Sequence, residues 1–206
     1  MDQKALYSLT YGLFVVGVEE NGWHGGCIVN TVIQQSSKPL FVSVTINKDN
    51  YTHDVLRRTK KITVSVLDES APFDLFKRFG FQSGRDALKW DDLEDKALSK
   101  NGTYHLTNHA AAYLSGRIVN MIDFATHTMF VIEVDDAQRL SKVPAVTYGY
   151  YRENIKPKAE NKSDRLTWVC TVCGYVYVGE EIPEDFVCPV CKHPASDFAP
   201  MKPKDS

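Results

Sequence analysis

Short, mostly apolar runs of the kind that form β-strands recur along most of the chain, separated by short polar turns. Six of these runs are rich in β-branched and aromatic residues, which favour strands. They are residues 11–19, 24–32, 40–46, 62–67, 113–121 and 128–134. Asn21-Gly22 stands between the first two runs and predicts a type I′ turn, which would join them in a β-hairpin. The pattern therefore predicts a mainly β fold whose strands close into a barrel.

Two segments show a helical pattern instead. Residues 51–59 follow Asn50, whose side chain is a suitable N-cap, and residues 71–79 carry Pro72 in their first turn. The barrel is thus predicted to carry a few helices.

A polar stretch divides the chain into a large and a small domain. Residues 152–164 contain one proline and lack a periodic apolar face, as expected of an exposed linker. One domain is predicted over residues 1–151 and a second over residues 165–206. A domain of about 40 residues rarely folds on its own hydrophobic core, so a bound metal is expected to stabilise the second one.

Composition and charge narrow the classes of partner. Of the 206 residues, 43% are hydrophobic and 24% charged, the profile of a soluble globular protein. The formal net charge of -2 offers no basic field to nucleic acid or to an anionic membrane. No apolar stretch is long enough for a bilayer, and none has the form of a secretory signal. We therefore expect a cytoplasmic protein without a nucleic-acid or membrane partner.

Four of the five cysteines form two CxxC pairs near the end of the sequence. The predicted metal ligands are Cys170, Cys173, Cys188 and Cys191. Four thiolates at this spacing can surround iron or zinc as a tetrahedron, and the spacing alone favours zinc in a purely structural role. Gly174 follows the first pair, where a positive φ would turn backbone N–H groups toward the sulfurs. The aromatic residues around the pairs exceed the needs of a small zinc site and favour iron: Trp168, Tyr175, Tyr177, Phe186 and Phe198.

Residues 166–201 resemble the rubredoxin family, in the short form found at the end of rubrerythrins. The resemblance rests on Trp-Val-Cys at 168–170, Cys-Gly-Tyr-Val-Tyr at 173–177 and Cys-Pro-Val-Cys at 188–191. It implies one iron bound by the four cysteines and a role in electron transfer. One departure is Lys192, which stands where the second turn usually has glycine.

Acidic residues gather between the two cysteine pairs. They are Glu180, Glu181, Glu184 and Asp185. This cluster is either a solvated surface or a docking face for an electron acceptor with a basic rim.

In the large domain, small, amide and hydroxyl side chains gather at predicted strand ends within residues 25–53. Such groups suit an anionic, planar ligand, and Thr52 and His53 lie at a predicted helix N-terminus, where a phosphate can bind. These residues are also common loop and cap formers, so the pattern alone is weak. No GxGxxG or P-loop motif is present, which argues against a dinucleotide-binding Rossmann domain and a nucleotide kinase.

Residues 1 to about 151 resemble the flavin reductase-like family of FMN-binding split barrels. The matching segments are residues 26–31 (GCIVNT), Lys38-Pro39, residues 47–53 (NKDNYTH), 79–86 (FGFQSGRD) and 127–134 (HTMFVIEV). The resemblance implies a split barrel and a homodimer with FMN bound near the subunit interface.

The resemblance also implies the flavin contacts. Asn30 and Thr31 would lie beside the isoalloxazine or ribityl chain, residues 47–53 would surround the phosphate, and residues 81–85 would close the site. The full implied set is Cys27, Val29, Asn30, Thr31, Asn47, Lys48, Asn50, Thr52, His53, Phe81, Ser83, Gly84, Arg85 and His127. Cys27 is interpreted as a small strand residue beside the flavin rather than as a redox thiol. His127 is either a core histidine or a cofactor contact, since Thr126 replaces the aspartate that often precedes it in the family.

The combination of the two domains resembles the high-molecular-weight rubredoxins. It implies a flavin-dependent NAD(P)H:rubredoxin-type oxidoreductase that passes electrons from NAD(P)H through FMN to iron. The acceptor would be a flavodiiron protein or a rubrerythrin-like protein. Two alternatives stay open: a flavin reductase with a structural zinc domain, and a flavin and iron electron carrier that NAD(P)H does not reduce.

Overall fold

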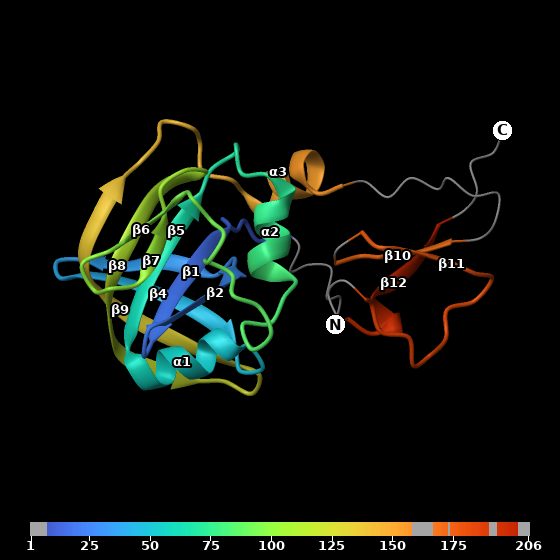
Figure 1. Ribbon diagram of the computed structural model, residues 1–206, viewed down its shortest axis with the longest axis horizontal. Helices are drawn as coiled ribbons and strands as arrows, with labels where there is room; N and C mark the ends of the chain where they lie inside the picture. Colours follow the sequence, from blue (N-terminus) through green and yellow to red (C-terminus); the bar gives the residue numbers. More distant parts are fainter. Residues whose placement is uncertain (1–7, 158–166, 173, 190–192, 202–206) are drawn as a thin grey trace. The chain divides into compact units, whose positions relative to one another are not determined.

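The structure is a computed structural model that describes residues 8–157, 167–172, 174–189 and 193–201. Its chain divides into two units, Met1–Glu153 and Asn154–Ser206. Figure 1 labels the elements of both units.

The first unit is built on a seven-stranded sheet in the order β2-β1-β5-β8-β9-β4-β3, with every neighbouring pair antiparallel. Its strands are β1 Phe14–Glu20, β2 Trp23–Val29, β3 Val32–Ser37, β4 Leu40–Asn47, β5 Lys61–Leu67, β8 Ala110–Asp123 and β9 His127–Arg139. Figure 1 shows the sheet curled into a barrel, with the helix α1 at one end. The predicted mainly β fold with a barrel and a few helices is confirmed.

Three helices and a small hairpin complete this unit. They are α1 Tyr51–Thr59, α2 Phe73–Gly80, α3 Tyr148–Tyr150 with a π-helical turn Tyr151–Ile155, and the two-stranded hairpin β6 Lys96–Leu98 with β7 Tyr104–Leu106. Pro72 is the N-cap of α2, so this helix starts slightly later than predicted. Tyr151 is buried against Phe76, with 4.6 Å between the ring centroids. The start of the predicted linker, residues 152–164, is therefore helical as far as Ile155, and residues 158–164 lie outside the described part.

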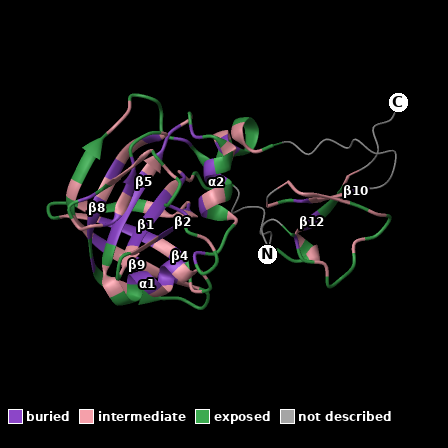
Figure 2. Ribbon diagram, in the orientation of Figure 1, coloured by how far each residue is buried: buried purple, intermediate pink, exposed green. Residues whose placement is uncertain are grey.

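The core fills the inside of the barrel and extends to the buried face of α1. Its buried residues are Val16, Val18, Cys27, Val29, Val44, Ile46, Val55, Leu56, Ile62, Val64, Ile118, Phe130 and Ile132. Figure 2 shows the buried positions of the barrel strands in purple. Buried positions alternate along β9, as the two-residue period of a strand requires, whereas β1 and β5 each carry four consecutive buried residues.

The hairpin predicted at Asn21-Gly22 is confirmed. β1 and β2 pair from Phe14↔Val29 to Glu20↔Trp23, and the turn residues have φ of 52° and 83°. Both positive φ values belong to a type I′ turn.

The prediction of one strand over residues 24–32 is wrong. β2 ends at Val29, and the chain then turns so that β3 pairs with β4 instead. The Thr31 hydroxyl fixes this corner by donating to the Thr45 carbonyl at 2.6 Å. β3 itself was not predicted, because its exposed Gln34 and Gln35 lack the apolar alternation of a half-buried strand.

The second unit is a three-stranded antiparallel sheet in the order β11-β10-β12. It comprises β10 Thr167–Cys170, β11 Val176–Val178, a 3-10 turn Ala195–Asp197 and β12 Phe198–Met201. Phe186 packs against Tyr177 and Phe198 at centroid distances of 4.8 and 5.4 Å. Within the described parts of the chain, no helix has the length and apolarity to span a bilayer.

Candidate functional site

The turn between β4 and α1 is held by its own side chains. The Asn50 side chain accepts a hydrogen bond from the Thr52 backbone N–H at 3.0 Å, which confirms Asn50 as the N-cap. The His53 N–H donates to the Asn50 carbonyl, and the Asp49 N–H donates to Asn47 Oδ1. The backbone donors of Thr52 and His53 are thus already used inside the protein. An anion here would be held chiefly by side chains.

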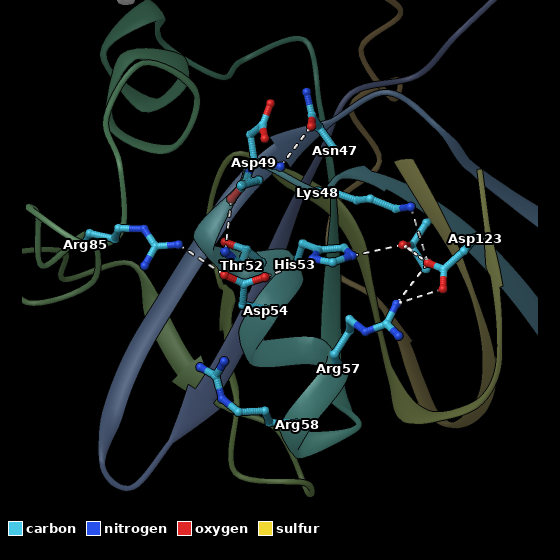
Figure 3. A network of polar contacts seen from close by, with 12 residues as sticks. Asn47, Lys48, Asp49, Thr52, His53, Asp54, Arg57, Arg58, Arg85 and Asp123 are labelled. Atoms are coloured by element: carbon cyan, nitrogen blue, oxygen red, sulfur yellow. Dashed lines mark hydrogen bonds and ion pairs between the residues drawn. The ribbon is translucent and has the colours of Figure 1, made fainter. Parts of the chain in front are cut away.

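A hydrogen-bonded chain runs from α1 to the β8–β9 hairpin. His53 is buried, and its Nε2 lies 2.9 Å from the Thr128 hydroxyl, which donates to Asp123 Oδ1 at 2.5 Å. The other ring nitrogen, Nδ1, lies 3.1 Å from Asp54 Oδ1. Figure 3 shows His53 and Asp54 on α1, with Asp123 on the neighbouring hairpin. Both nitrogens of His53 therefore contact protein atoms, although the sequence analysis placed this residue at a phosphate.

Cationic side chains surround this chain. Arg57 Nη1 contacts both oxygens of Asp123 at 2.9 and 3.2 Å, and Lys48 Nζ lies 3.9 Å from the same carboxylate. The Thr128 hydroxyl, followed by Arg57 and Lys48, lowers the pKa of Asp123 below its usual value. Asp123 is therefore ionised at neutral pH and holds two cations close together (Figure 3).

Arg85 reaches the same region from the loop after α2. Its guanidinium donates to Asp54 Oδ2 at 3.1 Å and lies over the Tyr51 ring, 4.6 Å from the centroid. Gly84 is buried beside Tyr51 and Trp23, where a Cβ atom would stand 3.4 Å from both rings. The loop predicted to close the site thus contacts the first turn of α1.

Two further predicted residues lie at the edge of this group. His127 is paired with Asn47 in the β4–β9 register, and its Nδ1 lies 2.8 Å from the Thr126 hydroxyl. The Cys27 thiol faces Asn50 and Thr52, and burial raises its pKa although Lys89 and the hydrogen bonds from these two residues act in the opposite direction. A protonated, buried thiol supports the interpretation of Cys27 as a packing residue.

Asn30 and Thr31 line a separate cavity of about 420 Å³ near the edge of the sheet. Its wall also contains Val32, Ser43 and Met129. This size lies in the range of small-molecule sites, and the mixture of hydroxyl, amide and apolar groups suits a ring system with polar edges.

Three further predicted flavin contacts have partners within the protein. Val29 is part of the barrel core, and Phe81 packs toward Phe73 with 6.0 Å between ring centroids. Ser83 accepts a hydrogen bond from the Arg85 backbone N–H within its own loop. The assignment of all these residues to a flavin stays a prediction.

Sequence reasoning missed four residues of this region. Three belong to the network around Asp123, namely Arg57, Asp123 itself and Thr128, and the fourth is Lys89, which acts on the Cys27 thiol. Asp123 and Thr128 face each other across the β8–β9 hairpin, which is a register that the sequence alone did not reveal. Arg57 lies one helical turn after His53, so the helical period was the available signal.

Two of the four predicted metal ligands lie in the described part of the second unit. Cys170 and Cys188 are both 0% exposed. Gly174 has φ of 81°, as predicted, and its N–H donates to the Cys170 carbonyl at 2.9 Å. Cys173 and Cys191 lie outside the described residues, as does Lys192. Two thiols buried beside an aromatic cluster fit a site from which water is excluded, as iron or zinc with thiolate ligands requires.

Comparison with known families decides the class of both units. The model of the flavin reductase like domain matches residues 6–159. The chain belongs to the flavin reductase-like family. The model of the rubrerythrin, rubredoxin-like domain matches residues 168–199, so a flavin reductase-like domain is followed by a rubredoxin-like one. The protein is accordingly a flavin-dependent oxidoreductase with a rubredoxin-like domain.

Two relatives cover most of the chain. The high molecular weight rubredoxin of Moorella thermoacetica is 33% identical over 93% of this chain and 96% of its own length. A ferric-chelate reductase (NAD(P)H) of Archaeoglobus fulgidus is 39% identical over 77% of this chain and 93% of its own.

Solved structures of flavin reductase-like proteins share the fold. The NADH:FAD oxidoreductase SgcE6 of Streptomyces globisporus has a TM-score of 0.63 at 22% identity, covering 70% of this chain and 85% of its own. An FMN-binding protein of Thermus thermophilus has a TM-score of 0.59 at 20% identity and covers 84% and 85%, respectively. At these identities the likeness concerns the split-barrel fold.

Proposed function

We propose that the protein transfers electrons from NAD(P)H through FMN to an iron bound by Cys170, Cys173, Cys188 and Cys191, and then to a protein acceptor. A flavodiiron protein or a rubrerythrin-like protein is the proposed acceptor. The observation that carries this proposal is the presence of a flavin reductase-like and a rubredoxin-like domain in one chain. The same combination is implied by the match to a high molecular weight rubredoxin along nearly the whole chain.

The pairing of the two domains has a chemical reason. A bound flavin accepts the two electrons of a hydride and gives them up one at a time, whereas a single iron centre changes by one electron. A protein that joins nicotinamide to a rubredoxin-type iron therefore needs a flavin between them.

The first unit supplies groups that fit such a cofactor. Lys48, Arg57 and Arg85 provide positive charge and N–H donors for a phosphate group, as phosphate recognition commonly requires. The cavity beside Asn30 and Thr31 is large enough for part of a ring system. FMN, whose phosphate and ring are separated by a ribityl chain, suits two such regions better than a compact ligand.

The second unit offers a surface for the acceptor. Glu180, Glu181, Glu184 and Asp185 are all exposed, and the apolar Val187 beside them is 53% exposed. Negative charge around an apolar contact would attract and orient a partner with a basic rim. Raising the salt concentration is therefore expected to slow reduction of the acceptor but not of the protein's own centres.

A homodimer is also proposed. The edge strand β3 carries Ile33, which is 62% exposed, and Asn30 to Ile33 line the cavity at this edge. A second copy placed there would cover the apolar side chain and complete the wall of the cavity. Sedimentation analysis at micromolar concentration tests this, and a monomer would contradict it.

The decisive experiment is the visible spectrum before and after anaerobic addition of NADH. Flavin and ferric–thiolate bands that both bleach would support the proposal. Flavin bands without iron bands, together with zinc in metal analysis, would favour a flavin reductase with a structural zinc domain. Flavin and iron bands that persist with both NADH and NADPH would favour a carrier reduced by another protein.

A further inference from the structure

We infer that the chain His53–Thr128–Asp123 positions Lys48 and Arg57 around the terminal phosphate of the flavin, and so makes the protein selective for FMN over riboflavin. This inference rests on the proposed function, because it concerns the same flavin site. Thr128 is the positioning residue at the centre of the chain, in contact with both His53 and Asp123.

The direction of each hydrogen bond can be derived from the groups involved. An ionised Asp123 only accepts, so the single hydroxyl proton of Thr128 is donated to it over 2.5 Å. With that proton committed to Asp123, the Thr128 oxygen can accept from His53 Nε2, which lies 2.9 Å away. The other ring nitrogen of His53 lies 3.1 Å from the Asp54 carboxylate. The ring is thus held from both sides, and the chain forms a link between α1 and the β8–β9 hairpin.

The inner half of the link is shielded from water. Thr128 is 0% exposed and His53 is 5% exposed, whereas the Asp123 side chain is 49% exposed, so solvent is excluded from the contact between His53 and Thr128. A buried hydrogen bond without such competition is costly to break, because the separated groups remain unsatisfied. The link therefore ties α1 firmly to the β8–β9 hairpin.

Asp123 transmits this rigidity to the cations. Arg57 comes from α1 and Lys48 from the turn after β4, and Asp123 of β8 contacts both. Lys48 Nζ also donates to the Phe124 carbonyl at 2.5 Å. Without a fixed Asp123, two long side chains would each lose rotamer freedom when a phosphate binds. With it, part of that entropy is already lost in the free protein.

The charges leave room for an anion. Two cations, Lys48 and Arg57, face one carboxylate, Asp123, which leaves one net positive charge. Two more carboxylates belong to the network: Asp54 is engaged by Arg85 and His53, and Asp49 lies in the turn beside Lys48 (Figure 3). A terminal phosphate carries close to two negative charges, and riboflavin has none at this position. The network therefore discriminates on the phosphate and not on the ring.

The test compares two ligands in a variant that removes one hydroxyl. Thr128→Val keeps the shape of the side chain but can neither donate to Asp123 nor accept from His53. We expect the affinity for FMN to fall roughly tenfold and the affinity for riboflavin to change less than twofold, as measured by flavin fluorescence titration of the apoprotein. The matched control is Thr59→Val. The Thr59 hydroxyl donates to the Val55 carbonyl within α1, so its removal should leave the affinities for FMN and for riboflavin as in the wild type.

A purely structural role of Thr128 predicts an equal loss for both flavins, and that result, or no loss for either, would overturn the inference. If Thr128→Val does not fold, Thr128→Ser and Thr128→Cys form a second pair. Serine keeps the hydroxyl and should restore the preference for FMN, while cysteine should not, and equal behaviour of the two would overturn the inference as well. If the wild-type protein binds neither flavin, the proposed function itself fails.

Discussion

Lys89 is a buried lysine that fastens the loop after α2 to the edge strand β2. It is 2% exposed, and its Nζ donates to the carbonyl oxygens of Gly26 at 2.9 Å and Phe79 at 3.1 Å. The next residue, Trp90, donates from Nε1 to the Gly25 carbonyl at 2.8 Å. Burial lowers the pKa of Lys89 to about 8. The ammonium thus satisfies two buried carbonyls at the cost of its own hydration.

Lys89→Met would keep the aliphatic length and remove the donors. Two buried carbonyls would lose their partner, so the free energy of unfolding should fall by about 1–3 kcal/mol at pH 7. Urea denaturation checks this. The control is Lys77→Met on α2, because Lys77 is exposed and pairs only with Asp74 at the surface, and it should change stability by less than about 0.5 kcal/mol.

The same lysine gives a pH dependence with a defined sign. Its pKa is about 8 in the folded protein and near the usual lysine value of 10.5 when unfolded, so above pH 8 the unfolded state binds more protons. The stability of the wild type relative to Lys89→Met should therefore rise with pH, by about 1–2 kcal/mol between pH 7 and 9.5. Neutral lysine still has two N–H groups for the two carbonyls. A stability difference that is flat or falls over this range would contradict the assignment.

At the scale of elements, β2 depends on two adjacent glycines. A Cβ atom on Gly26 would lie 2.4 Å from the Val16 carbonyl oxygen in the neighbouring strand, and one on Gly25 would overlap the Trp23 ring. The sequence analysis interpreted the small, amide and hydroxyl side chains within residues 25–53 as suited to an anionic, planar ligand. The structure gives a packing reason that applies without any ligand.

Gly26→Ala should consequently destabilise the barrel. Its Cβ would meet backbone and not a movable side chain, so β1 and β2 must separate locally, at about 1–3 kcal/mol. Thermal unfolding followed by circular dichroism measures the effect. Gly149→Ala is the matched control, because its Cβ would find no atom closer than 3.8 Å, and a similar loss in both variants would refute the packing explanation.

Elements fixed by local signals were predictable, and those fixed by distant partners were not. The Asn21-Gly22 turn and the Asn50 cap depend on neighbouring residues only, and both were found from the sequence. The edge strand β3 and the short hairpin β6–β7 carry too little apolar alternation to stand out. In the site, the loop over residues 47–53 was recognised, but His53 binds Thr128, 75 residues away, which no local pattern contains.

At the scale of the whole molecule, the proposed function depends on bringing a flavin and an iron close together within one chain or between two. Joining two centres by a tether raises the effective concentration of each at the other, provided that the tether can span the distance. Since Tyr151–Ile155 is helical, only residues 156–164 of the predicted linker would add reach. Fully extended, nine residues would span at most ~30 Å.

Deleting residues 159–164 tests this requirement. The three residues left would span at most ~10 Å, so the iron should be reduced by NADH at least several-fold more slowly in stopped-flow mixing. Reduction of the flavin should keep its rate, because the deletion leaves the first unit unchanged. Replacing the same six residues with glycine and serine keeps the length and should preserve both rates. An unchanged rate of iron reduction in the shortened protein would contradict this requirement, because it would mean that electron transfer from the flavin to the iron does not depend on the length of this tether.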